Sequence, residues 1–214
     1  MSTSGPAAAA HHPARAAIVV PGGNYTADGP LLNYAAHAAR RRTAHVHRIT
    51  WSRPAPRSPA AAGDPAAGLT TGPEHDRWAA YRDWVTGQVT DALGQVTAAT
   101  GVTAPVLLAK SLGSLAAPLA ARRGLPAVWF TPLLTDPSTV AALRRVAAPR
   151  LLIGGTADTF WDGPAARSIT THVLEIDGAG HNMLVPGPLA ASAAILGRVT
   201  TAVERFLDQE AWPA

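Results

Sequence analysis

Six short apolar runs that alternate with longer segments of helical periodicity constrain the fold of this 214-residue chain more than any other feature. Runs of this length without polar alternation are typical of strands buried on both faces of a parallel sheet. The runs are 16–20, 44–50, 105–110, 126–131, 150–154 and 172–176, of which 44–50 is the weakest because His45, His47 and Arg48 interrupt it. The helical segments are 30–42, 74–99, 112–123, 138–146 and 188–210. This alternation predicts an α/β fold built on a doubly wound, mostly parallel six-stranded sheet.

The length and the apolar content of the chain fit one domain. The sequence is 47% hydrophobic, which supplies enough apolar surface for a single core. Residues 1–14 contain an alanine run without helical or strand patterning, and we expect them to form a disordered leader. Residues 15–214 then form the domain. The segment 53–73 is rich in proline, alanine and glycine, and it is interpreted as a long surface loop rather than a domain boundary.

Several classes of protein are excluded by composition. The chain has no cysteine, so disulfides, thiolate metal sites and a cysteine nucleophile are ruled out. It has no apolar stretch of about 18 residues and no recognisable secretory signal, so no membrane partner is expected and a cytoplasmic protein is the default. The formal net charge is +4, but the arginine clusters lie near the ends of predicted helices, where cations complement the helix dipole. We therefore expect no nucleic-acid partner.

Three residues with complementary chemistry follow three different strands. In a doubly wound sheet the ligand binds beyond the carboxyl ends of the strands, so the residues there are the candidates for chemistry. Ser111 follows the third run, Asp158 the fifth and His181 the sixth. A serine hydroxyl becomes a nucleophile only when a base takes its proton, and that base needs a carboxylate to orient it. The chain order Ser, Asp, His is that of the α/β-hydrolases.

Ser111 stands in the sequence Ala109-Lys110-Ser111-Leu112-Gly113, between a predicted strand and a predicted helix. A strand that turns sharply into a helix needs small residues two positions before and after the turn, because larger side chains would collide. Such an elbow leaves the serine hydroxyl exposed and the Leu112 N–H free to bind an oxyanion. Alanine instead of glycine at position 109 is a mild departure from the usual pattern.

Residues 16–206 resemble the small α/β-hydrolases that lack a lid. The resemblance rests on the elbow, on Pro-Gly-Gly after the first run, on Gly-Gly-Thr-Ala-Asp at the fifth and on Gly-Ala-Gly-His after the sixth. The chain is similar to the dienelactone-hydrolase-like group and to the Tex30/KANSL3-like group, whose members carry a comparable lysine- or arginine-containing elbow. This implies a minimal α/β-hydrolase fold without a cap domain. It also implies Ser111 as nucleophile, His181 as base and Asp158 as acid.

The resemblance further implies an oxyanion hole. Its donors would be the Leu112 N–H and one N–H of the turn after the first strand. The family usually has His-Gly in this turn, whereas this chain has Pro21-Gly22, so the second donor is either Gly23 or Asn24. Gly23 is favoured, because it follows the equivalent of His-Gly.

Each member of the predicted triad also has a structural explanation. A Ser-x-Gly sequence after a strand, as at Ser111, is common in proteins without such a site. Asp158 can cap a helix or bind its own backbone, and His181 can be a loop histidine without a partner. Asp136, after the fourth run, is the rival acid, and Asp162 is a remote third. Asp158 is preferred.

The residues next to the same rim are expected to line the substrate pocket. They are Tyr25, Trp51, Lys110, Leu134, Phe160, Trp161 and Met183. Lys110 is the only lysine of the chain. In one interpretation it supplies a cation close to the oxyanion or close to a carboxylate of the substrate. In the other it pairs with a carboxylate of the protein on a face of the sheet. Only residues 132–149 separate the fourth and fifth runs, which leaves no room for a cap domain and predicts a shallow, open cleft unless the loop 53–73 folds over it.

Together these features predict a serine hydrolase that cleaves an ester, thioester or lactone through an acyl-enzyme. The expected partner is a small-molecule acyl substrate, no metal or organic cofactor is required, and the assembly is a monomer or a homodimer. The fold alone does not decide function. The alternative is therefore a protein of the same fold with a non-hydrolytic role, as a cyclase, a dehydratase, an acyl-transfer enzyme or a ligand-binding module. A scaffolding or regulatory role is a third possibility.

Overall fold

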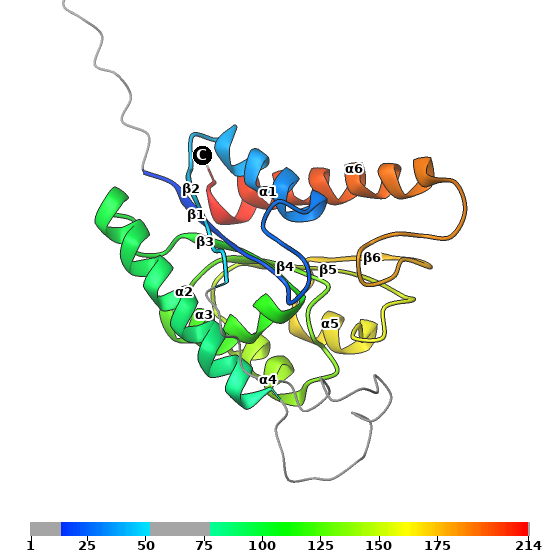
Figure 1. The fold of residues 1–214 in the computed structure, drawn as a ribbon, viewed down its shortest axis with the longest axis horizontal. Helices are drawn as coiled ribbons and strands as arrows, with labels where there is room; N and C mark the ends of the chain where they lie inside the picture. The colour runs from blue at the N-terminus through cyan, green and yellow to red at the C-terminus, as the bar shows by residue number, and fades with distance from the viewer. Residues whose placement is uncertain (1–13, 52–77, 214) are drawn as a thin grey trace, which may run out of the picture.

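The computed structural model of the protein describes residues 14–51 and 78–213 (Figure 1). The expected loop 53–73 lies outside these ranges, and so does the expected leader apart from Ala14. The strands are β1 (Ala16–Val20), β2 (His45–Arg48), β3 (Val106–Lys110), β4 (Ala127–Phe130), β5 (Arg150–Gly155) and β6 (Val173–Ile176). The α-helices are α1 (Pro30–Arg40), α2 (Ala79–Thr100), α3 (Ala117–Arg123), α4 (Pro137–Arg145), α5 (Gly163–Ile169) and α6 (Leu189–Phe206).

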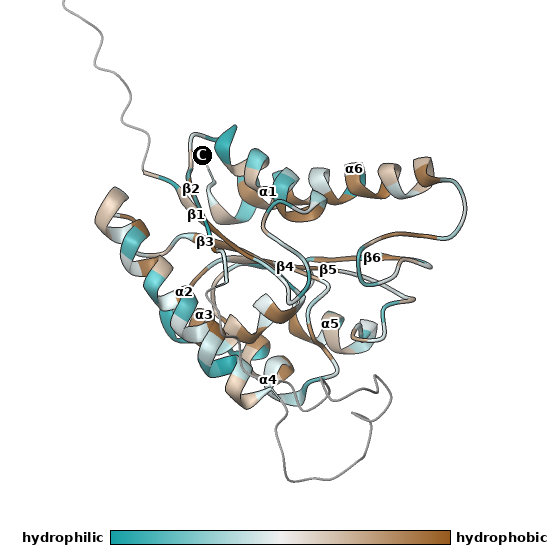
Figure 2. Cartoon of the chain, in the orientation of Figure 1, coloured by the Kyte–Doolittle hydropathy of each residue, from teal (hydrophilic) through white to brown (hydrophobic). Residues whose placement is uncertain are grey.

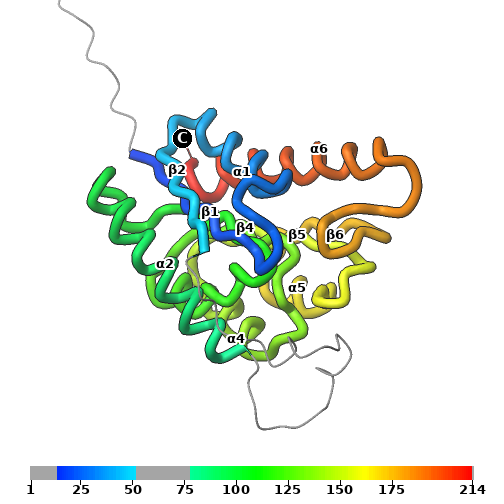
Figure 3. Tube along the Cα trace, in the orientation of Figure 1, coloured from blue at the N-terminus to red at the C-terminus, as the bar shows by residue number. Residues whose placement is uncertain are grey.

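The strands form one sheet in the order β2-β1-β3-β4-β5-β6, and each neighbouring pair is parallel. Helices α1 and α6 cover one face and lie side by side (Figures 1 and 3). Helices α2, α3, α4 and α5 cover the other face (Figure 1). The predicted doubly wound six-stranded sheet is thus confirmed. The strand order reverses direction at β1 and β3, and this is where ligands bind in open α/β sheets.

The core has two halves, one on each side of the sheet, because successive strand residues point to opposite faces. Ile18 and Val20 pack toward α2 and α3, whereas Ala17 and Val19 pack toward α1 and α6. The apolar colouring of the strands and of the inward helix faces shows both layers (Figure 2). The inner strands β1, β3, β4 and β5 lack polar alternation because both of their faces are covered, whereas the edge strands β2 and β6 are only partly buried and carry polar residues.

The ends of several helices follow the sequence signals. The paired arginines 122–123 and 144–145 lie in the last turns of α3 and α4, and Arg40 ends α1. Gly124 caps α3 with a left-handed backbone, at φ 61°. Within the described residues, no helix combines the length and the apolarity needed to cross a bilayer.

Two local predictions need correction, and one helix was missed. The sequence predicts Ser138 as the N-cap of the helix 138–146 and a kink at Pro118 inside the helix 112–123. Helix α4 is capped by the side chain of Asp136 rather than by Ser138, because the Asp136 carboxylate accepts from the amides of Ser138 and Thr139. Pro118 does not kink the helix after the elbow. The chain first makes the 3₁₀ turn η3 (Ser111–Ala116), and α3 begins at Ala117, so Pro118 occupies the first turn, where its missing N–H costs nothing. Helix α5 was not predicted, since seven residues carry too little periodicity.

Candidate active site

The turn after β3 has the geometry of a nucleophile elbow. Ser111 has a φ of 52°, a conformation that a non-glycine residue adopts only when its surroundings enforce it. Gly113 allows the turn, because a Cβ at this position would lie 2.9 Å from the carbonyl oxygen of Val20. Ala109 is paired with Val20 in the sheet and is fully buried, so it also had to be small. The elbow therefore presents Ser111 at the carboxyl end of the central strand.

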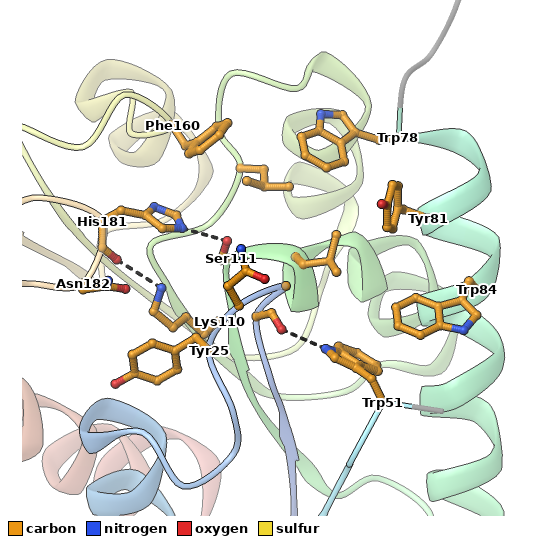
Figure 4. A pocket seen from close by; sticks show the side chains of 15 residues that line it. Tyr25, Trp51, Trp78, Tyr81, Trp84, Lys110, Ser111, Phe160, His181 and Asn182 are labelled. Carbon is orange, nitrogen blue, oxygen red and sulfur yellow. Dashed lines mark hydrogen bonds between the residues drawn. The ribbon is translucent and has the colours of Figure 1, made fainter. Parts of the chain in front are cut away.

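Ser111, His181 and Asp158 form one chain of hydrogen bonds (Figure 4 shows the first link). The distance from His181 Nε2 to Ser111 Oγ is 2.7 Å, and His181 Nδ1 lies 2.8 Å from Asp158 Oδ2. A carboxylate only accepts hydrogen bonds, so the proton of the neutral imidazole is on Nδ1 and the Nε2 lone pair faces the serine hydroxyl. The Asp158 side chain is fully buried, whereas the His181 side chain keeps 31% of its surface exposed.

Backbone contacts between two loops bring Asp158 and His181 together. A Cβ on Gly155 would lie 2.1 Å from the carbonyl oxygen of Ala179, so the loop after β5 and the loop after β6 are in direct backbone contact. The amide of Ala157 donates to the same carbonyl at 3.1 Å. The amide of Phe160 donates to Asp158 Oδ1 at 3.0 Å and holds the carboxylate that faces His181.

Lys110 is buried beside the predicted triad. It is 1% exposed, its Nζ donates to the backbone carbonyl of His181 at 3.1 Å, and the ammonium lies 4.6 Å from the centre of the Tyr25 ring. This partner is a carbonyl, not the sheet-face carboxylate of the second interpretation. Burial lowers the pKa of Lys110 from the ordinary value of 10.5 to about 8, and the nearby Asp158 charge opposes this shift only in part.

The lowered pKa of Lys110 predicts a pH dependence of stability. Between about pH 8 and pH 10.5 the unfolded chain binds a proton that the folded chain does not, so the free energy of unfolding rises with pH. From about pH 7 to pH 9.5 this gain is about 2 kcal/mol, and Lys110→Met removes it. Urea unfolding of both proteins at the two pH values measures the difference. An equal response of both proteins would show that the Lys110 charge is well solvated. The comparison stops at pH 9.5 because burial also raises the pKa of Tyr25. Above about pH 10 this tyrosine ionises more readily in the unfolded chain than in the folded chain, which lowers the free energy of unfolding as pH rises.

The turn after β1 lies against the elbow. A Cβ on Gly22 would be 3.5 Å from Ser111 Cβ, and one on Gly23 would be 3.8 Å from a methyl group of Leu112. The Gly22 amide donates to the carbonyl of Tyr25 at 2.9 Å and is therefore not available to a substrate. The carbonyl of Gly22 accepts from the indole N–H of Trp51 at 2.8 Å.

A cleft of about 550 Å³ opens above Ser111 and His181 (Figure 4). It is lined by Gly22, Gly23, Asn24, Tyr25, Trp51, Trp78, Tyr81, Trp84, Lys110, Ser111, Leu112, Leu133, Phe160, His181 and Asn182. Four of the predicted pocket residues, Tyr25, Trp51, Lys110 and Phe160, are among them. The phenyl ring of Phe160 also contacts the imidazole of His181, with the ring centres 5.3 Å apart.

Three predicted pocket residues do not line the cleft. Leu134 is 3% exposed and packs in the core, and its neighbour Leu133 reaches the cleft instead. Trp161 packs against Gly154, where a Cβ would lie 2.0 Å from the indole, and its N–H donates to Glu175 at 2.7 Å. Met183 is 2% exposed, in the core layer of α1 and α6.

The aromatic residues of α2 and of the turn before it were missed as cleft residues. Trp78, Tyr81 and Trp84 are spaced by three, which places them on one side of a helix. The three- and four-residue steps from Trp78 through Tyr81 and Val85 to Val96 predict a single apolar stripe along the helix 74–99, with both aromatic residues on it. The stripe is buried from Val85 onward, whereas these aromatic residues remain partly exposed in the cleft. The spacing was a usable signal, but it does not distinguish a cleft from a core.

The rival acids have other roles. Asp136 caps α4 and pairs with Arg82 at 3.1 Å. Asp162 caps α5 by accepting from the amide of Ala165 at 2.8 Å. Within residues 14–51 and 78–213, no three histidine, aspartate or glutamate side chains are grouped so that they could hold a metal ion.

No family model and no curated protein matches the sequence, but solved structures match the fold. An α/β serine hydrolase without lid from Xanthomonas campestris is 16% identical, with 96% of this chain and 87% of that chain covered and a TM-score of 0.62. A dienelactone hydrolase from Anabaena variabilis is 18% identical over 92% and 87% of the two chains, with a TM-score of 0.60. A monoacylglycerol lipase from Paleococcus ferrophilus is 13% identical over 89% and 97%, with a TM-score of 0.55. The fold of this chain is therefore that of the small α/β-hydrolases.

Proposed function

We propose that the protein is a serine hydrolase that cleaves a carboxylic ester, thioester or lactone. One observation carries the proposal: the unbroken series of hydrogen bonds from Ser111 through His181 to the buried carboxylate of Asp158, at the floor of a cleft. This arrangement activates a hydroxyl group that is otherwise a weak nucleophile at neutral pH. The hydrolase fold of the chain agrees with it.

The first half-reaction transfers the acyl group to the enzyme. Ser111 Oγ attacks the carbonyl carbon while His181 Nε2 takes the hydroxyl proton, and the carbonyl becomes an oxyanion. The tetrahedral intermediate collapses, the bond to the leaving oxygen or sulfur breaks, and His181 donates the proton to that atom. Asp158 keeps the imidazole in the required tautomer and stabilises its protonated form.

The second half-reaction regenerates the enzyme with water. His181 takes a proton from a water molecule, whose oxygen attacks the carbonyl of the acyl-Ser111 ester. Collapse releases the carboxylic acid and returns the proton to Ser111 Oγ. The balance is one ester and one water consumed, with one acid and one alcohol or thiol formed, and no redox step is needed.

The oxyanion is stabilised by the amides of Leu112 and Gly23. The Gly22 amide is occupied by Tyr25, so the next amide of the turn is the first free candidate. Gly23 and Leu112 both line the cleft beside Ser111, and a Cβ on Gly23 would lie 3.8 Å from a methyl group of Leu112. The loss of one such donor costs about 3 to 4 kcal/mol of transition-state stabilisation.

A fluorophosphonate probe tests the proposed function. The probe phosphonylates a serine only when a neighbouring base activates the hydroxyl, so we expect one adduct per chain, on the peptide that contains Ser111. Ser114 is an internal control, because its buried hydroxyl binds the amide of Leu133 at 3.1 Å and has no histidine partner. A folded protein without an adduct would instead favour the ligand-binding module.

A further inference from the structure

The cleft has a wall of aromatic side chains on one side of Ser111. This aromatic wall consists of Trp51, Trp78, Tyr81 and Trp84 (Figure 4). Its rings form a continuous series: the ring centres of Trp51 and Trp84 are 4.8 Å apart, those of Trp84 and Tyr81 6.5 Å, and those of Tyr81 and Trp78 6.0 Å. All four side chains are partly exposed, so the wall has surface that a ligand can contact.

The topology places the aromatic wall and the catalytic base on opposite sides of Ser111. Ser111 follows β3, and the sheet continues from there to β1 and β2 in one direction and to β4, β5 and β6 in the other. Trp51 follows β2, and α2 packs against β1, β2 and η3. His181 follows β6. The close-up agrees, with the wall and His181 on opposite sides of the serine (Figure 4).

The reaction geometry decides which part of the substrate faces the wall. In the tetrahedral intermediate the carbonyl carbon carries Ser111 Oγ, the oxyanion, the leaving atom and the acyl chain. His181 has to protonate the leaving atom, so that atom lies within hydrogen-bond distance of Nε2. The oxyanion faces the amides of Leu112 and Gly23. The acyl chain takes the remaining direction, away from His181 and toward the aromatic wall.

Among the described residues that line the cleft, those on this side are uncharged and mostly apolar. Leu112 and Leu133 accompany the aromatic wall, whereas the buried cation Lys110 donates to the carbonyl of His181 on the opposite side. Flat rings gain more from stacking or edge contacts with indoles than aliphatic chains of similar size. We infer, on the basis of the proposed hydrolase function, that the preferred substrates are esters whose acyl group carries an uncharged aromatic ring.

Two isomeric esters test this inference. Methyl 3-phenylpropanoate carries its ring on the acyl side, and 2-phenylethyl acetate carries the same ring on the alcohol side. We expect kcat/KM to be about tenfold or more higher for the first, because only its ring reaches the aromatic wall. Methyl 3-cyclohexylpropanoate, which has the same reach without a π-system, is expected to react more slowly than the phenyl compound. Equal rates for the isomers, or a preference for the acetate, would overturn the inference.

Variants connect the selectivity to the aromatic wall. Trp84→Leu is expected to lower the ratio of kcat/KM for methyl 3-phenylpropanoate to kcat/KM for 2-phenylethyl acetate by about three- to tenfold. Tyr34→Leu is the matched control, because Tyr34 is a 50% exposed ring on α1 outside the cleft. Unchanged selectivity in Trp84→Leu would contradict the assignment of the wall. Absence of turnover of every ester, p-nitrophenyl acetate included, would refute the hydrolase function itself rather than the acyl preference.

An independent contact gives Trp51 a second role. Its indole N–H donates to the Gly22 carbonyl at 2.8 Å, and the carbonyl and the next N–H of a trans peptide point in opposite directions. The hydrogen bond therefore fixes the direction of the Gly23 N–H, one of the two oxyanion donors under the proposed function. The geometry assigns Trp51 as a positioning residue for the oxyanion hole.

The variant Trp51→Phe keeps an aromatic ring and removes the N–H. For p-nitrophenyl acetate, whose acyl group has no ring, we expect kcat to fall about tenfold or more while KM stays within about twofold, because the donor acts on the transition state. Tyr34→Leu, at an exposed ring outside the cleft, is the comparison variant and should leave this kcat unchanged within about twofold. Circular dichroism and the thermal midpoint verify the fold of Trp51→Phe. A folded variant with the kcat of the natural protein would overturn the assignment.

Discussion

Replacement of Ser111 with alanine is expected to lower kcat for p-nitrophenyl acetate by at least about 10⁴-fold, because no acyl-enzyme can form without the hydroxyl. The hydrogen bond to His181 Nε2 is lost, but the base and its carboxylate remain hydrogen-bonded to each other. The fold is expected to survive, since the side chain is partly exposed and belongs to no core cluster. Initial rates and far-ultraviolet circular dichroism measure the two effects.

Ser114→Ala is the matched control for this prediction. Ser114 lies one turn further along η3, and its hydroxyl accepts from the Leu133 amide in the core. Its loss leaves that buried amide without a partner, so stability falls by about 1 to 3 kcal/mol while turnover per folded molecule stays the same. Full activity in Ser111→Ala would remove the serine mechanism, whatever the control does.

Asp158→Asn is expected to have the second-largest effect on catalysis. The carboxamide has the shape of the carboxylate, but it neither balances a protonated imidazole nor requires the proton to be on Nδ1. With the proton on Nε2 instead, His181 cannot accept the serine proton, and kcat is expected to fall by about 10⁴-fold. The Asp158 side chain is fully buried, and its Oδ2 lies 2.8 Å from His181 Nδ1.

Asp136→Asn provides the contrasting result. Asp136 was the rival acid, and it caps α4 and pairs with Arg82 rather than with a histidine. Its substitution should lower the thermal midpoint through the weakened cap and ion pair, with turnover per folded molecule within about twofold of the natural protein. A large loss of kcat in Asp136→Asn, together with an unchanged kcat in Asp158→Asn, would show that Asp136 rather than Asp158 is the acid of the triad.

The four inner strands were the most predictable part of the sheet because they are buried on both faces, whereas the edge strands β2 and β6 are only partly buried. The unbroken apolar runs and the alternation with helices determine both the strand positions and the parallel order. The helix after the elbow was predicted only in part, since Pro118 fits the first turn of α3 as well as it would kink a longer helix. Helix α5 is short, and its cap residue Asp162 was considered only as a possible acid.

The positions of the candidate site residues were predictable where backbone topology determines them. Ser111, Asp158 and His181 follow strand ends that a parallel sheet brings to one edge, and the structure places all three in hydrogen-bond contact. The pocket was less predictable, because side-chain direction depends on packing. Trp161 turns away from the cleft because Gly154 leaves space for its indole on the sheet. Trp84 lies in the cleft because α2 packs against η3.

The most direct measurement of the central claim is the mass of the protein during turnover of an ester. A reaction with p-nitrophenyl acetate, quenched in acid within the first turnover, is predicted to contain a species heavier by one acetyl group, and fragmentation is predicted to locate that group on Ser111. The species should be absent from Ser111→Ala. Product release with no acylated protein at any quench time, or with the acetyl group on another residue, would contradict the account.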